Sequence, residues 1–304
     1  EPAQTVLPDV ITRWQAGGGR GSACKQPFAR LYASGLLSDA QLWERAAAAM
    51  ENGDVSAAKD VASHFNTAHY RSLFSLWPRA VSAPLTLLRS ADIDDSGEGR
   101  RVALHALARL ARQDVDGARA AWQAMSQRLT FDERERGRAA RSIALAAASS
   151  NHAARIALLD AVPAAAVDVD VQRYQLREGV ALMAWQELAR WTQLPPQIPD
   201  ESLRWRYWHA RAVGEIGRRE ESMQLLRELA TERDYYGFLA ADRAGLEYQF
   251  REAPIAATRA ELDALGARAG LIRSREFERV SLPQHAAREW NFEMKQLTPR
   301  QLEV

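Results

Sequence analysis

The residues best suited to bind a ligand lie in residues 204–245, where two tryptophans and four tyrosine or phenylalanine rings occur in an alanine-rich chain. Such rings can stack on sugar rings or peptide stems, and neighbouring arginines can donate hydrogen bonds to them. We expect Arg206, Tyr207 and Arg211 to line a surface that binds substrate, because they fall outside the stripe predicted to be buried.

Helical spacing explains most of these rings without a ligand. Trp205, Trp208 and Ala212 follow one another at i, i+3 and i+7, which is the spacing of a buried stripe on a helix. Similar spacing in a later helix predicts a second buried stripe of Tyr235, Phe238 and Leu239. Most of the cluster is therefore predicted to be core.

Other chemical patterns are incomplete. Asp92, Asp94 and Ser96 match the first half of a calcium-binding loop, but its twelfth position, which needs a glutamate, is Ala103. We expect this loop to be polar, with acids that cap the next helix. No pair of histidines has a metal-binding spacing among His64, His69, His105, His152, His209 and His285. The sequence predicts no metal site, no cofactor and no catalytic constellation.

Charge and hydropathy restrict the partners. Forty lysines and arginines balance 39 acids, for a net charge of +1, which disfavours nucleic acid and anionic membranes. The apolar runs are far shorter than the roughly 20 residues of a membrane-spanning helix. Because the chain opens with Glu1-Pro2 and without a leader pattern, we expect a processed form or an excised piece.

The single cysteine, Cys24, excludes an internal disulfide. We favour a partly buried thiol, and the alternative is a disulfide to a segment outside this chain.

Helix-forming residues dominate, and short polar or glycine turns separate the helices. Ser38 is predicted to cap one helix that Gly53 ends, and Asp54 to cap the next. Similar turns occur near residues 113 and 217. We predict an all-α, right-handed superhelix (α-solenoid) of antiparallel helical hairpins, tetratricopeptide-like but without an exact period of about 34 residues. A compact helical bundle is the alternative.

Two breaks suggest the organisation of the chain. Pro195, Pro196 and Pro199 predict a linker or sharp corner, and residues 249–257 predict a loop at a domain boundary. We expect a superhelical domain over residues 1–250 and the start of a linker helical domain over residues 251–304.

The order of motifs in residues 201–249 resembles the signature segment of soluble lytic murein transglycosylases. The segment contains Trp205-Arg206-Tyr207-Trp208, then Gly217-Arg218, then Tyr236-Gly237-Phe238-Leu239-Ala240-Ala241. A weaker match begins at Ala23-Cys24, where this family carries a cysteine, and the resemblance implies a pairing of Cys24 with an upstream cysteine. Alkylation of longer and shorter forms would test that pairing.

The resemblance implies a function in the bacterial periplasm. The family cleaves the β-1,4 bond between N-acetylmuramic acid and N-acetylglucosamine in peptidoglycan and leaves a 1,6-anhydro product. Its catalytic glutamate lies in a Glu-Ser pair before a Gly-x-x-Gly-Leu-Met-Gln run. Neither Glu201-Ser202 nor Glu221-Ser222 is followed by such a run. We therefore expect this chain to lack the catalytic domain, to be inactive alone, and to position wall strands, with other cell-wall enzymes as further partners.

Two other classes of protein remain open. A tetratricopeptide-like scaffold would bind a protein partner, and no catalytic motif would follow it in the full reading frame. A complete all-helical enzyme would need a polar cavity with paired carboxylates.

Overall fold

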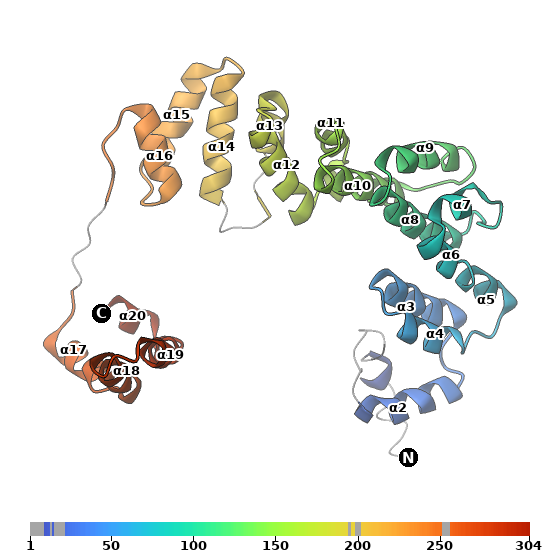
Figure 1. Ribbon diagram of the computed structural model, residues 1–304, viewed down its shortest axis with the longest axis horizontal. Helices are drawn as coiled ribbons and strands as arrows, with labels where there is room; N and C mark the ends of the chain where they lie inside the picture. The colour runs from blue at the N-terminus through green and yellow to red at the C-terminus, as the bar shows by residue number, and fades with distance from the viewer. Residues whose placement is uncertain (1–8, 13, 15–21, 194–195, 198–201, 251–255) are drawn as a thin grey trace. The chain divides into compact units, whose positions relative to one another are not determined.

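The protein is described by a computed structural model that covers residues 9–12, 14, 22–193, 196–197, 202–250 and 256–304 (Figure 1). Its contacts divide the chain into two units, Glu1–Leu246 and Glu247–Val304. All regular structure in these ranges is helical, so the all-α prediction is confirmed. The predicted domain boundary after residue 250 stays a prediction, and Pro195 and Pro199 lie outside the described residues.

The first unit consists of short helices that contact their neighbours in the chain. Their bounds are α2 Ser22–Ala33, α3 Asp39–Glu51, α4 Val55–Ala62, α5 Ala68–Phe74, α6 Trp77–Ser82, α7 Pro84–Arg89, α8 Gly97–Ala111, α9 Val115–Met125, α10 Glu133–Ser149, α11 Arg155–Asp160, the 3-10 turn η1 Ala164–Ala166, α12 Val169–Ala181, α13 Trp185–Trp191, α14 Ser202–Glu215, α15 Arg219–Leu229 and α16 Tyr235–Ala244. The second unit contains α17 Arg259–Gly266, α18 Ala269–Arg279, α19 Pro283–Met294 and α20 Pro299–Glu303.

Helix starts follow the predicted capping chemistry. Ser38 accepts a hydrogen bond from the backbone N–H of Gln41, whose side chain binds back to the Ser38 N–H. Asp54 accepts from the N–H of Ala57 at 3.2 Å and begins α4. In the incomplete calcium-binding loop, Ser96 caps α8 by accepting from Gly99 N–H, so the prediction of an acidic cap there is wrong. Asp94 instead accepts hydrogen bonds from the Ser96 side chain and backbone.

A left-handed residue ends the first helix of many hairpins. The positions concerned are Gly53, Asn151, Met183, Gly217 and Ser281, with φ between 52° and 94°. The next backbone N–H then bonds back to a carbonyl five residues earlier, as from Asp54 to Ala49 at 2.8 Å and from Arg218 to Val213 at 3.1 Å. This Schellman arrangement satisfies the last carbonyls of the helix and reverses the chain in two or three residues. Paired helices must therefore be antiparallel neighbours.

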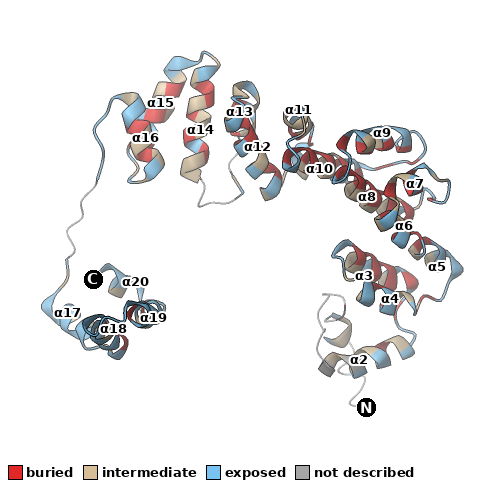
Figure 2. Cartoon of the chain, in the orientation of Figure 1, coloured by how far each residue is buried: buried red, intermediate tan, exposed pale blue. Residues whose placement is uncertain are grey.

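Small residues allow the paired helices to approach closely. A Cβ added at Gly214 of α14 would lie 2.7 Å from the Ser222 Oγ of α15, and one added at Gly179 of α12 would lie 3.1 Å from Leu188 of α13. Ser222 donates to the carbonyl of Ala210 at 2.7 Å and so satisfies its hydroxyl within the contact. Burial accordingly follows one face of the paired helices α3 and α4 and of α15 (Figure 2).

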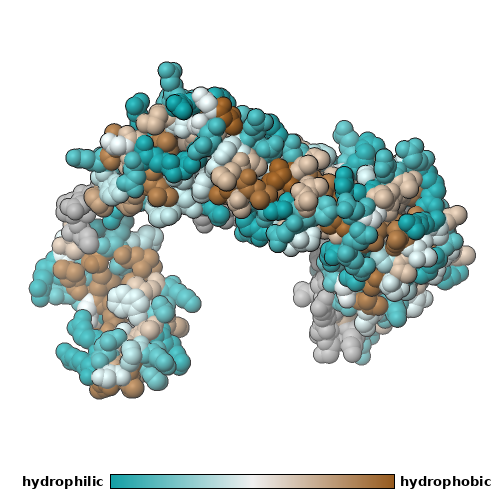
Figure 3. Space-filling view, turned by 45° about the horizontal axis from the view of Figure 1, so that its top comes forward, coloured by the Kyte–Doolittle hydropathy of each residue, from teal (hydrophilic) through white to brown (hydrophobic). Residues whose placement is uncertain are grey.

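The two units differ in how much apolar surface they bury. One continuous buried cluster extends from Trp14 to Ala147 in the first unit, and three smaller clusters follow it. In the second unit Ala286 is the one buried apolar residue among those described. Large apolar side chains are exposed there, and Figure 3 shows hydrophobic residues on its visible surface. They are Tyr248, Phe250, Leu262, Ile272, Val280, Leu282, Trp290, Phe292 and Leu302.

The turn geometry predicts the effect of a small substitution. Gly217 has φ of 94°, and no atom lies within 4 Å of the position that a methyl group would take, so Gly217→Ala adds backbone strain without a clash. We expect a loss of about 1–2 kcal/mol in the free energy of unfolding, measured by chemical denaturation. Gly97→Ala is the control, because a Cβ there meets only Arg100 at 3.9 Å on a helix. Equal stability of the two variants would contradict the left-handed turn.

Candidate functional site

The predicted binding segment forms α14, α15 and α16, which pack against one another. Trp205 and Ala212 of α14 are buried, as predicted, in a cluster that includes Leu188. Trp208 is partly buried and contacts the Tyr207 ring edge-on at 5.4 Å. The aromatic stripe of α14 is therefore core.

The predictions for the exposure of Tyr207 and the burial of Tyr235 are both wrong. Tyr207 is only 4% exposed, so the prediction that its ring lines an open surface is wrong. Its position faces α16, where its ring lies 5.7 Å from Tyr236 and its hydroxyl accepts a hydrogen bond from Arg243 Nε at 2.9 Å. Tyr235 is 65% exposed and not core, because it is the first residue of α16 and the next residue, Tyr236, packs into the cluster.

The two predicted arginines differ in accessibility. The Arg206 side chain is 47% exposed and lies 3.6 Å from the carboxylate of Glu232. The Arg211 side chain is 17% exposed, donates to Glu215 at 2.8 Å and lies over the Trp185 ring at 5.7 Å. Arg206 thus retains donors for a ligand, whereas Arg211 is held by neighbours. Substrate binding by either stays a prediction.

The remaining sequence candidates are not brought together. Glu221 accepts a hydrogen bond from Arg218 at 2.8 Å on the same exposed turn, and Glu201 lies outside the described residues. Cys24 is a partly buried free thiol on α2. Among the described residues, no group of three or more histidines, cysteines or acids is arranged to hold a metal ion. Within the same residues, no helix is long and apolar enough to cross a membrane.

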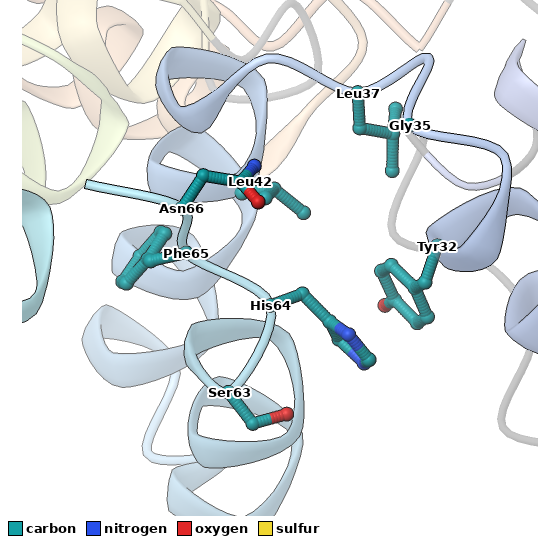
Figure 4. Close-up of a pocket in the computed structure, with 8 residues that line it drawn as sticks. All are labelled: Tyr32, Gly35, Leu37, Leu42, Ser63, His64, Phe65 and Asn66. Atoms are coloured by element: carbon teal, nitrogen blue, oxygen red, sulfur yellow. The ribbon is translucent and has the colours of Figure 1, made fainter.

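The structure contains a pocket that the sequence did not single out (Figure 4). It lies where the end of α2 meets the start of α3 and the loop after α4, and its volume is about 270 Å³. The residues that line it are Tyr32, Gly35, Leu37, Leu42, Ser63, His64, Phe65 and Asn66. Tyr32 and His64 stack with ring centroids 3.9 Å apart and an interplanar angle of 11°.

Neighbouring groups fix the two sides of this pocket. The indole Nε1 of Trp14 donates to the Tyr32 hydroxyl at 2.9 Å. Burial raises the pKa of Tyr32, and the Trp14 hydrogen bond offsets this only in part, so the hydroxyl stays protonated at neutral pH. Burial also acts to raise the pKa of Asp39, but hydrogen bonds from Asn66 and Thr67 outweigh it and lower that pKa below its ordinary value. Asp39 is therefore a stable anion under the loop.

No local signal in the sequence indicated this pocket. Tyr32 and His64 are separated by a helical hairpin, and neither belongs to a recognised spacing. Only the arrangement of α2 beside the loop after α4 brings their rings into contact.

Comparison with known proteins supports the family resemblance. No family model matches the chain. Over 241 residues, 78% of this chain, it is 26% identical to the soluble lytic murein transglycosylases of Escherichia coli K12 and of Salmonella typhimurium LT2. It spans 37% of their length.

Solved structures extend the match to the fold. An inactive mutant of the lytic transglycosylase Slt from Pseudomonas aeruginosa aligns with 98% of this chain at a TM-score of 0.75 and 26% identity. The 70 kDa soluble lytic transglycosylase SLT70 of E. coli aligns with 99% at a TM-score of 0.70 and 22% identity. The chain spans 48% of each. The resemblance to soluble lytic murein transglycosylases and the superhelical fold are both confirmed.

A partly buried histidine in α14 predicts a pH dependence of stability. His209 Nδ1 lies 2.9 Å from Thr192 Oγ1, and burial lowers the pKa of His209, while Glu221 opposes that change. As the pH falls, His209 therefore binds a proton in the unfolded chain before it does so in the folded chain. The contribution of neutral His209 to the free energy of unfolding is fully present above about pH 6.5 and is lost as the pH falls toward and through the lowered pKa.

The corresponding variant is His209→Gln, which does not titrate. We expect its free energy of unfolding to fall less steeply between pH 7.5 and 5 than that of the natural chain, by less than about 1.4 kcal/mol per pH unit. Some slope remains, because burial also lowers the pKa of His105. The free energy of unfolding is measured by urea titration at each pH. If it depends on pH in the same way for His209→Gln and for the natural chain, the role of His209 is contradicted.

Proposed function

From the similarity to soluble lytic murein transglycosylases, we propose that this chain is the superhelical region of such an enzyme and holds peptidoglycan strands without cutting them. The observation that carries the proposal is the alignment of nearly the whole chain with about half of Slt from P. aeruginosa. In this proposal residues 1–250 are the superhelical domain and residues 251–304 begin a linker domain.

The chemistry of the reaction supports a division of labour. Cleavage of the β-1,4 bond between N-acetylmuramic acid and N-acetylglucosamine to a 1,6-anhydro product needs an acid that protonates the leaving oxygen and then a base for the attacking hydroxyl. Neither Glu-Ser pair of this chain is followed by the Gly-x-x-Gly-Leu-Met-Gln run. Glu221 is paired with Arg218 on an exposed turn, which leaves its carboxylate ionised and solvated rather than placed as a general acid. The described residues therefore support a role in binding peptidoglycan rather than in cleaving it.

Binding would use exposed polar groups of the helical array. Peptidoglycan carries carboxylates on its peptide stems, and Arg206 is 47% exposed on α14 with donors available to them. A chain with a net charge of +1 makes such contacts locally rather than through a general positive field. The proposed location is the periplasm, and other cell-wall enzymes are proposed partners.

A protein-binding scaffold is the second candidate function. The exposed apolar side chains of the second unit, such as Trp290 and Phe292, are the observation that favours it. Such a scaffold would retain a protein partner and show no affinity for purified cell walls.

Co-sedimentation with purified peptidoglycan sacculi tests the first function. We expect the chain to pellet with sacculi, and Arg206→Ala to weaken binding by about two- to fivefold, as is typical of one exposed charged contact. Arg259→Ala is a matched control, because this arginine is also exposed and lies in the other unit. A chain that stays in the supernatant would contradict the proposed function. Equal binding of Arg206→Ala and Arg259→Ala to sacculi would show that Arg206 does not contact peptidoglycan.

A further inference from the structure

The Tyr32–His64 pocket has the features of a small binding site. Its two stacked rings come from α2 and from the loop after α4 and face each other, so their edges and outer faces are what a ligand can contact (Figure 4). The hydroxyl of Tyr32 already accepts from Trp14, so its own proton is left to donate. Aromatic edges beside a directed polar group can contact a ring that is apolar on its faces and polar at its edge.

The pocket also offers hydrogen-bonding groups that no described residue of the protein uses. Among the described residues, no donor or acceptor contacts either ring nitrogen of His64 or the side-chain oxygen of Asn66. The hydroxyl of Ser63 donates to the Asp60 carbonyl at 2.6 Å, which leaves its oxygen able to accept. A ligand that is both donor and acceptor can satisfy all three.

Charge and shape narrow the ligand class. None of the eight lining residues is an acid, a lysine or an arginine, so a charged ligand would lose its hydration without gaining a counter-charge. Leu37 and Leu42 are buried and supply apolar side chains to the lining. About 270 Å³ is just below the usual 300–1,000 Å³ of ligand pockets, which suits one ring and a short substituent.

The loop that carries His64 is held in place before any ligand arrives. The Asp39 carboxylate accepts from the backbone N–H groups of Asn66 at 2.8 Å and Thr67 at 2.7 Å. Arg71 Nη1 donates to the Phe65 carbonyl at 2.7 Å. Such bonds lower the entropy lost when a ligand binds.

We propose that this pocket binds a single uncharged, N-acetylated amino-sugar ring. The acetamido methyl would contact the side chains of Leu37 and Leu42, while the amide and hydroxyl groups would meet Tyr32, His64 and Asn66. This inference deepens the proposed function and rests on it for the choice of a wall glycan as the natural ligand. In the chain, the pocket is a second contact point for the strand, far along the sequence from Arg206.

Titration calorimetry of the full chain with triacetylchitotriose, an uncharged oligomer of N-acetylglucosamine, tests the pocket. We expect binding that His64→Ala weakens by at least about fivefold, because it removes both an aromatic contact and a hydrogen-bonding group. His69→Ala is the matched control, since His69 is exposed, lies in the same stretch and does not line the pocket. Maltotriose, which lacks the acetamido group, should not bind.

A second variant keeps the test valid if His64→Ala unfolds. Ser63→Phe places a ring at the exposed rim and should abolish chitotriose binding while the circular dichroism spectrum stays unchanged. No chitotriose binding by the natural chain, or equal binding by the His64 and His69 variants, would overturn the pocket proposal. If the chain binds sacculi but not chitotriose, the pocket proposal fails and the proposed function stands. If it binds chitotriose but not sacculi, the pocket binds the sugar and the proposed function fails.

Discussion

The structure depends on how closely the two helices of each hairpin can approach. A Cβ at Gly214 would collide with Ser222 of the partner helix at 2.7 Å, and one at Gly179 would press on Leu188 at 3.1 Å. The left-handed residue that ends the first helix sets the tight reversal that makes this contact unavoidable. Each hairpin then buries its remaining apolar face on its neighbours, so stability accumulates along the chain from local interfaces.

Arginine–carboxylate pairs join successive helices across these interfaces. Arg100 of α8 binds Glu135 of α10 at 3.0 Å, and Arg155 of α11 binds Glu178 of α12 at 2.8 Å. Burial acts to raise the pKa of Glu178, but Arg155 and Arg177 outweigh it and hold that pKa below its ordinary value. These arginines are thus used inside the fold, in contrast to Arg206, whose side chain is 47% exposed.

The sequence was sufficient to predict local structure but not contacts between distant segments. Caps at Ser38 and Asp54 and turns at Gly53 and Gly217 were predictable, because each residue type has a specific backbone role. Met183 was not, because a left-handed methionine has no propensity signal. Tyr207 was misplaced because a third helix, α16, covers a face that two-helix periodicity leaves open. The Tyr32–His64 pocket required the relation of α2 to a later loop, which no spacing encodes.

The central proposal is that this helical array holds wall strands but does not cut them. The most direct measurement is mass spectrometry of the soluble products after the purified chain has been incubated with peptidoglycan. We predict that 1,6-anhydro-muropeptides stay at the level of a protein-free control, even when all sacculi are bound by the chain. Release of anhydro-muropeptides above that level would contradict the proposal and place a catalytic acid within these 304 residues.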